Sequence, residues 1–156
     1  MRIGFGYDVH AFAEGRELWL GGIRIDHPQG LMGHSDADVL IHAICDALFG
    51  AANLRDIGYH FPDSDDKYAN LKSKLFLHHA MNMVKEVGFQ LENIDATIVA
   101  EQPKLCPYIP EMKKKLAEIM GVSENDISLK ATTTEKLGFT GRGEGVAVYA
   151  VALLKK

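Results

Sequence analysis

The segment 38–53 constrains the fold most, because it predicts a helix that is apolar on nearly every side. Asp38 is a typical N-cap, and the three residues after it would form an apolar first turn. Apolar residues then continue around the helix axis as far as Phe49. A helix that is hydrophobic all round is buried. The remainder of the chain must therefore supply elements that cover this helix.

Alternating and β-branched segments predict strands around this helix. The expected strands are residues 2–12, a hairpin at 19–25, and the segments 90–101, 127–134 and 146–154. The last of these is apolar on both faces, so both faces should be covered, by helices or by another subunit.

Two further helices are predicted, at 67–87 and 110–120, each followed by a glycine that would end it. The segments 55–66 and 132–145 lack a helical period and are expected to be loops. No linker divides the chain, and we expect residues 1–156 to form a single domain.

The charge and apolar pattern argue against nucleic-acid and membrane partners. The formal net charge is −4, and no basic face of the kind that binds a duplex is visible. The lysine cluster Lys113-Lys114-Lys115 lies on a predicted helix and indicates a solvated face. The longest apolar run, 146–154, is too short to cross a bilayer. Cys45 and Cys106 do not make a disulfide framework, which fits a reducing compartment. We expect a cytoplasmic bacterial protein, or an organelle stromal protein whose transit peptide has been removed.

Three side chains form a candidate metal site. Asp8 and His10 alternate along the first predicted strand, so they would share one face. His42 lies four residues after the N-cap of the apolar helix. One carboxylate and two imidazoles with an open fourth position are typical of a reactive zinc site. The alternative is two unrelated surface histidines, since the chain contains neither HExxH nor CxxC.

Further polar side chains surround these three in the sequence. His34 and Ser35 precede the apolar helix, whose N-terminus would attract an anion such as phosphate. Asp46 lies four residues after His42, so it could either orient that histidine or face solvent. The expected loop 55–66 is rich in aspartate.

The glycine-rich segment 132–145 has the side chains of a phosphate-binding loop. Threonine hydroxyls and backbone N–H groups donate to phosphate, and Glu135 could hold Mg²⁺ beside it. The segment is not a Walker A loop because it has no GK[ST] ending. A plain glycine-rich surface loop is the alternative interpretation.

Taken together, these fragments resemble the 2-C-methyl-D-erythritol 2,4-cyclodiphosphate synthase family of the non-mevalonate isoprenoid pathway. The matching runs follow the family's order and are Gly6-Tyr7-Asp8-Val9-His10, Gly33 to Val39, Asp56-Ile57-Gly58 with His60 to Asp63, Pro103-Lys104-Leu105, and Lys130 to Gly145. One departure is Arg55, where the family has glycine.

The resemblance implies an α/β fold of two layers, in which a mixed sheet carries helices on one side. It further implies a homotrimer whose sheets pack around a central apolar cavity, with active sites between neighbouring subunits. The implied substrate is 4-diphosphocytidyl-2-C-methyl-D-erythritol 2-phosphate. Its 2-phosphate would attack the β-phosphate, close a cyclic diphosphate and release CMP.

The resemblance also implies roles for individual residues. Zn²⁺ would be held by Asp8, His10 and His42, and a second divalent ion, Mg²⁺ or Mn²⁺, by Glu135. Transition-state stabilisation would fall to His34 and Thr133. The erythritol phosphate would be bound by Ser35, Asp56, Ile57, Gly58, Phe61, Asp63 and Asp65. The cytidine would be bound by Ala100, Pro103, Lys104, Leu105, Cys106, Ala131 and Thr132, while Phe139 and Arg142 would lie near the phosphates and the trimer axis.

Two other functions use the same residues. A zinc hydrolase would employ metal-bound water in place of the intramolecular phosphate. A non-catalytic trimer would bind an isoprenoid diphosphate in its central cavity, with Phe139 and Arg142 as the important residues. The reaction product distinguishes these three functions.

Overall fold

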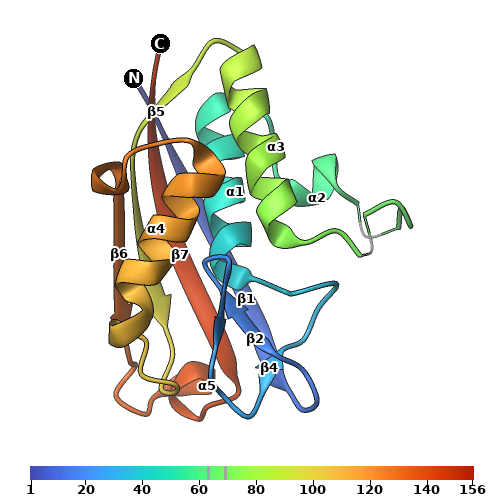
Figure 1. The fold of residues 1–156 in the computed structure, drawn as a ribbon, viewed down its shortest axis with the longest axis vertical. Helices are drawn as coiled ribbons and strands as arrows, with labels where there is room; N and C mark the ends of the chain where they lie inside the picture. Colours follow the sequence, from blue (N-terminus) through green and yellow to red (C-terminus); the bar gives the residue numbers. More distant parts are fainter. Residues whose placement is uncertain (63, 69) are drawn as a thin grey trace.

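The computed structural model describes residues 1–62, 64–68 and 70–156, which form two layers (Figure 1). One layer is a five-stranded mixed sheet in the order β4-β1-β7-β5-β6. Only the β5–β6 pair among these strands is parallel. The strands are β1 (Arg2–Ala13), β4 (Gly30–Leu31), β5 (Gln90–Val99), β6 (Ile127–Thr132) and β7 (Gly145–Lys155).

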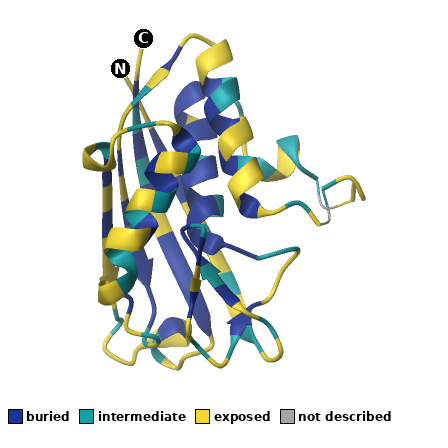
Figure 2. Ribbon diagram, in the orientation of Figure 1, coloured by how far each residue is buried: buried dark blue, intermediate teal, exposed yellow. Residues whose placement is uncertain are grey.

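Helices cover one face of this sheet (Figure 1), which confirms the expected mixed sheet with helices on one side. The central helix α1 is buried along most of its length, as Figure 2 shows. The helices are α1 (Val39–Ala52), α2 (Ile57–His60), α3 (Ser73–Glu86), α4 (Ile109–Met120) and α5 (Gly138–Gly141). A hairpin of β2 (Leu18–Leu20) and β3 (Ile23–Ile25) and two 3₁₀ turns, η1 (Cys106–Tyr108) and η2 (Glu124–Asp126), complete the described elements.

Two glycines of β1 bring this strand close to α1. A Cβ on Gly4 or Gly6 would lie 1.9 Å from a backbone oxygen of α1, that of Ala47 or Ala43. Because side chains alternate along a strand, Asp8 and His10 point to the same helix-covered side as these glycines. The close approach of β1 and α1 therefore places the candidate ligands of the strand opposite His42 of the helix.

None of the described helices covers the other face of the sheet (Figure 1). It exposes large apolar side chains of β1 and β7, with exposed fractions between 42% and 72%. These residues are Ile3, Phe5, Tyr7, Val9 and Tyr149. An exposed apolar patch of this kind is typical of an interaction surface. None of the described helices is long and apolar enough to cross a membrane.

The largest differences from the predicted elements concern three helices. The helix expected at 67–87 begins only at Ser73, because its first turn is capped by the distant Asp36, whose carboxylate accepts from the Ser73 N–H at 3.2 Å. Short helices α2 and α5 occupy segments expected to be loops. Each has four residues, too few to show an apolar period.

Arg55 takes the backbone conformation that the family's glycine would favour. Its φ of 73° lies in the left-handed region, which costs a non-glycine residue about 1 kcal/mol. The guanidinium lies 4.0 Å from the centre of the Tyr59 ring, a stabilising cation–π contact. Although Arg55 departs from the family's pattern, the backbone at this position keeps a conformation typical of glycine.

Asp38 is the N-cap of α1, as predicted, and it also anchors the hairpin. Its fully buried carboxylate accepts from the Ile41 N–H at 3.1 Å and from the N–H groups of Gly21 and Gly22 at 3.0 and 2.7 Å. The side chain thus joins the β2–β3 turn to the start of the helix that carries His42.

Replacing Asp38 by Ala should destabilise the fold by about 3–5 kcal/mol, because three backbone donors lose their buried charged acceptor. The free energy of unfolding from denaturant titration measures this effect. The exposed Asp26 at the end of β3 provides the control, and Asp26→Ala should change stability by less than about 0.5 kcal/mol. Equal effects of the two substitutions would contradict the anchoring role.

Candidate metal centre and active site

Asp8, His10 and His42 converge on the helix-covered side of β1. Asp8 Oδ2 lies 2.9 Å from His10 Nε2 and 3.2 Å from His42 Nδ1, and the two nitrogens lie 3.3 Å apart. These three side chains are each partly buried and could hold a metal ion. The structure thus confirms that the triad predicted from the sequence comes together.

The spacing of the triad fits a tetrahedral ion. Bonds of about 2.0–2.1 Å place neighbouring ligand atoms of a tetrahedron about 3.3–3.4 Å apart, close to the observed separations. Two imidazoles and one carboxylate are a donor set that zinc accepts, and three protein ligands leave one position for substrate.

Both imidazoles are oriented through their second nitrogen. His10 Nδ1 donates to the carbonyl oxygen of Met32 at 2.6 Å, which leaves the lone pair of Nε2 for the triad. His42 Nε2 lies 3.0 Å from the hydroxyl of Ser73, so Nδ1 faces the triad. Partners of this kind fix ligand orientation at metal centres. Neither Met32 nor Ser73 was predicted from the sequence, because no local pattern marks them.

The charges of Asp8 and His10 stabilise each other. Burial raises the pKa of Asp8, but hydrogen bonds with His10 and His42 outweigh it and hold this pKa well below its usual range. Burial lowers the pKa of His10, but the hydrogen bonds with Asp8 and with Met32 outweigh it and raise this pKa. An incoming cation would therefore find an ionised carboxylate at Asp8.

A cavity of about 280 Å³ adjoins the triad, and it contains four of the other predicted residues, His34, Ile57, Gly58 and Phe61. Tyr68 and Phe76 also line it, although sequence reasoning did not single them out. We call this the triad cavity. Its mixed polar and aromatic lining suits a small phosphorylated molecule.

Of three further predicted aspartates, two accept backbone hydrogen bonds near the triad cavity's sequence segments and one lies outside the described residues. Asp56 caps α2 by accepting from the Tyr59 N–H at 2.8 Å, and Asp65 accepts from the Lys67 N–H at 3.0 Å. Asp63 lies outside the described residues.

Asp46 does not orient His42, so that interpretation was wrong. Its carboxylate accepts from the Ile57 N–H at 2.8 Å and thus fixes the start of α2, while both nitrogens of His42 have other neighbours. Burial raises the pKa of Asp46. The spacing of four residues correctly placed Asp46 on the same side of α1 as His42, and both line the triad cavity.

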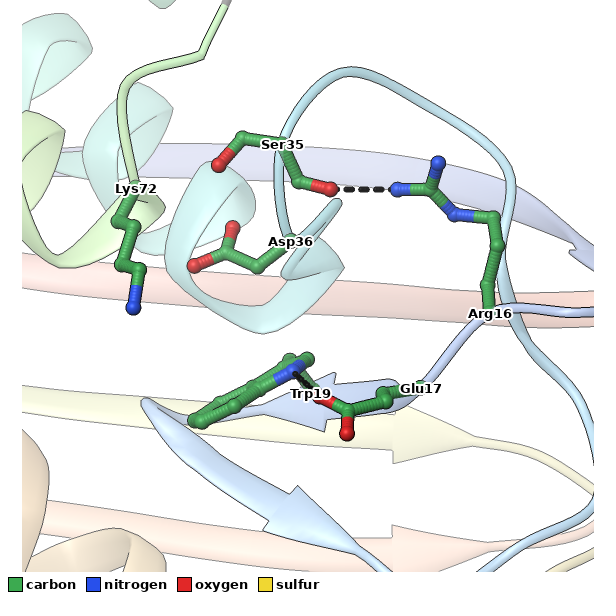
Figure 3. A pocket seen from close by; sticks show the side chains of 6 residues that line it. All are labelled: Arg16, Glu17, Trp19, Ser35, Asp36 and Lys72. Atoms are coloured by element: carbon green, nitrogen blue, oxygen red, sulfur yellow. Dashed lines mark hydrogen bonds between the residues drawn. The ribbon is translucent and has the colours of Figure 1, made fainter.

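Ser35 lines a different cavity, of about 440 Å³. Its backbone carbonyl accepts from Arg16, and Trp19 donates its indole N–H to Glu17 at 3.2 Å (Figure 3). Figure 3 shows Asp36 and Lys72 extending into the same space. We call this the Trp19 cavity.

A third cavity, of about 140 Å³, lies between the 100–106 loop and the end of β6. We call it the strand-end pocket. It is lined by all the residues that the family resemblance connects with cytidine and by one predicted catalytic residue, namely Ala100, Pro103, Lys104, Leu105, Cys106, Ala131, Thr132 and Thr133. Its exposed lysine and backbone-rich loop suit a nucleotide.

Within one chain the triad and the strand-end pocket do not meet. The strands β7 and β5 separate β1 from β6, and three strand spacings amount to about 14 Å. The predicted Glu135 lies beside the strand-end pocket. Thr133, which lines that pocket, donates its hydroxyl to the Glu135 carboxylate at 3.4 Å. Phe139 lies on α5, and the exposed Arg142 pairs with Glu144 at 2.7 Å.

Residues 1–155 match the model of the YgbB family. The chain belongs to the YgbB family. Curated relatives named 2-C-methyl-D-erythritol 2,4-cyclodiphosphate synthase match it over almost its whole length. The relative from Parabacteroides distasonis is 65% identical over all of this chain and 97% of its own length. The relative from Porphyromonas gingivalis is 67% identical over 98% of this chain and 94% of its own.

Solved structures of this family have the same fold. The bifunctional IspDF from Campylobacter jejuni matches with a TM-score of 0.95 and 47% identity, over 99% of this chain and 42% of its own. A CDP-bound 2C-methyl-D-erythritol-2,4-cyclodiphosphate synthase matches with a TM-score of 0.91 and 37% identity, over 99% of this chain and all of its own. A CDP complex of IspF from Plasmodium falciparum matches with a TM-score of 0.86 and 32% identity, over 98% of this chain and 94% of its own. These matches confirm the family and fold class expected from the motifs.

Proposed function

We propose that this YgbB-family enzyme converts 4-diphosphocytidyl-2-C-methyl-D-erythritol 2-phosphate to 2-C-methyl-D-erythritol 2,4-cyclodiphosphate and CMP. The observation that carries the proposal is the combination of the metal-binding triad with a strand-end pocket, in a chain 65% identical to an enzyme of that name. The two solved CDP complexes support a cytidine nucleotide as part of the substrate.

The reaction needs positioning more than an activated nucleophile. The 2-phosphate oxygen forms a bond to the β-phosphorus, and the bond from that phosphorus to the CMP oxygen breaks. A phosphate is already a nucleophile, so no serine or cysteine has to be deprotonated. The difficulty is to hold two anions together, which residues with fixed donors and cations relieve.

We assign Asp8, His10 and His42 to Zn²⁺, which when bound would supply Lewis-acid neutralisation of phosphate charge. The fit rests on the donor set and the spacing of about 3 Å between its atoms. Glu135 would hold a second divalent ion, Mg²⁺ or Mn²⁺, because such ions bind through few carboxylates and complete their shell with substrate phosphates.

The other predicted residues would bind and orient the substrate. His34 and Thr133 would donate hydrogen bonds to phosphate oxygens as charge shifts toward CMP. The erythritol end would occupy the triad cavity, and we assign Ser35, Asp56, Asp63 and Asp65 to binding of its phosphate. The cytidine would occupy the strand-end pocket, where backbone groups of the 100–106 loop would contact the base.

We propose a homotrimer because one chain separates the two halves of the site. Packing of the exposed apolar faces of β1 and β7 around a three-fold axis would cover Phe5, Tyr7 and Tyr149. It would also bring the strand-end pocket of one subunit to the triad of its neighbour. Phe139 and Arg142 would then lie toward the axis, where an apolar cavity could take an isoprenoid diphosphate. Neither nucleic acid nor membrane is a proposed partner, and the proposed location is the bacterial cytoplasm.

A product assay by ³¹P NMR tests the proposal. Purified protein is mixed with the cytidyl substrate and Mg²⁺, with and without a zinc chelator. The expected result is two coupled ring phosphorus signals together with free CMP, lost with the chelator and restored by zinc. Free CMP without ring signals would favour the hydrolase. No turnover by zinc-loaded protein would favour the binding trimer.

Replacing Thr133 by Ala should lower kcat about 100-fold and leave thermal stability nearly unchanged, because a partly exposed hydroxyl that donates to developing charge is removed. Steady-state kinetics and thermal unfolding measure the two quantities. Thr133→Ser keeps the hydroxyl and should recover most of the activity. A variant that loses stability but retains specific activity would show that Thr133 has a structural role only.

A further inference from the structure

We propose that Ser73 and Asp36 are positioning residues that hold His42 in the tautomer required of a metal ligand. The inference deepens the proposed function, because its purpose depends on the metal assigned to the triad. The three side chains come from different segments, namely the helix α1, the start of α3 and the loop before α1. They form a continuous hydrogen-bonded chain from the triad to the Trp19 cavity.

The contacts of this chain are short and partly buried. Ser73 Oγ lies 3.0 Å from His42 Nε2 and donates to Asp36 Oδ1 at 2.5 Å. Ser73 is 1% exposed, so water does not compete for its hydroxyl. Asp36 in turn lines the Trp19 cavity, where its carboxylate reaches solvent (Figure 3).

The direction of each hydrogen bond follows from the number of protons available. A serine hydroxyl has one proton, and a carboxylate can only accept. Since Ser73 donates its proton to Asp36, its oxygen must accept from His42, and Nε2 of that histidine must carry the proton. The nitrogen left for a metal ion is then Nδ1, which faces Asp8 and His10.

Capping of α3 does not by itself account for this arrangement. Asp36 accepts from the backbone N–H of Ser73, and that contact would persist with any side chain at position 73. The hydroxyl adds a second contact, directed at the triad. His10 is oriented by a backbone carbonyl, whereas His42 depends on a side chain that can be removed.

The first test is the tautomer of His42 in metal-free Asp8→Asn protein, read from imidazole ¹⁵N chemical shifts in alkaline buffer. This background removes the carboxylate that draws a proton to Nδ1. With Ser73 in place we expect the form protonated at Nε2, and with Ser73→Ala added we expect a mixture of both tautomers. Loss of a helix cap does not move this signal, so an unchanged tautomer on adding Ser73→Ala would overturn the proposal.

The second test is zinc affinity, measured by competition with a chromogenic chelator. Ser73→Ala should bind zinc about 10–100-fold more weakly, the usual effect of losing such a supporting contact. Ser123→Ala is the matched control, because Ser123 caps η2 through the Asn125 N–H and touches none of the triad. Its affinity should equal that of the wild type. Equal affinity of Ser73→Ala and the control would contradict the proposal.

Asp36→Asn provides a second variant in case Ser73→Ala does not fold. The amide can accept from Ser73 but can also donate to it, so the direction of the chain is no longer imposed. We expect a mixed His42 tautomer here too, and an unmixed one would overturn the proposal. Failure of the wild type to bind zinc would instead remove the metal from the proposed function, while the tautomer readout would still decide the positioning role.

Discussion

Replacing Asp8 by Asn should lower kcat at least about 1,000-fold and zinc affinity at least about 100-fold, while the chain stays folded. Asp8 is the one charged oxygen ligand of the triad, and both His10 and His42 contact it. The amide is similar in shape but carries no charge to offset a divalent ion. The measurements are steady-state kinetics, bound zinc by mass spectrometry and far-UV circular dichroism.

The control for this substitution is Asp95→Asn. Asp95 is an exposed carboxylate on β5 that pairs with Lys130, outside all three cavities. Its removal should leave kcat and zinc content unchanged, because exposed ion pairs contribute little. Turnover by zinc-free Asp8→Asn protein at the wild-type rate would refute the metal assignment.

The Asp8 variant should also change how the metal-free protein responds to pH. The lowered pKa of Asp8 stabilises the fold above the ordinary aspartate pKa, and this contribution is lost as the pH falls. The raised pKa of His10 stabilises the fold below the ordinary histidine pKa, and this contribution is lost as the pH rises. Thermal unfolding should therefore show the largest difference between wild type and variant at about pH 4–6.5. A difference that is independent of pH would contradict the pairing.

Replacing Gly6 by Ala should destabilise the protein by more than about 5 kcal/mol and abolish folding at ordinary temperature. The new Cβ would lie 1.9 Å from the backbone oxygen of Ala43 and 2.8 Å from the Ala47 N. Both atoms belong to the backbone of α1, so no side chain can rotate away. Strand and helix would have to separate, which would also part Asp8 from His42.

Gly50→Ala is the matched control, since it makes the same chemical change on α1. A Cβ there meets its nearest neighbour, the oxygen of Phe5, at an ordinary 3.9 Å. Because alanine favours a helix over glycine, the control should gain up to about 1 kcal/mol. Unfolding free energies of the two variants and soluble yield measure the contrast. A Gly6→Ala protein as stable as the control would show that β1 and α1 can separate without loss.

The features that the sequence alone determined are local or repeated along the chain. Asp38 was correctly placed as the start of α1, because capping depends on residue type and on the apolar turn that follows. Alternation along β1 correctly put Asp8 and His10 on one face, because side chains alternate in every strand. The family motifs likewise predicted the residues that line the strand-end pocket.

Only the tertiary structure decided which distant groups meet. Ser73 is hydrogen-bonded to Asp36, which lies 37 positions earlier in the chain. This contact lies at the start of α3, and the Ser73 hydroxyl also contacts His42. Asp46 had the spacing to support His42, yet packing gave it the N–H of Ile57 instead. Strand order likewise set the separation between the triad and the strand-end pocket. Contacts between segments far apart in the chain depend on how whole elements pack, and that packing is not encoded in any local pattern.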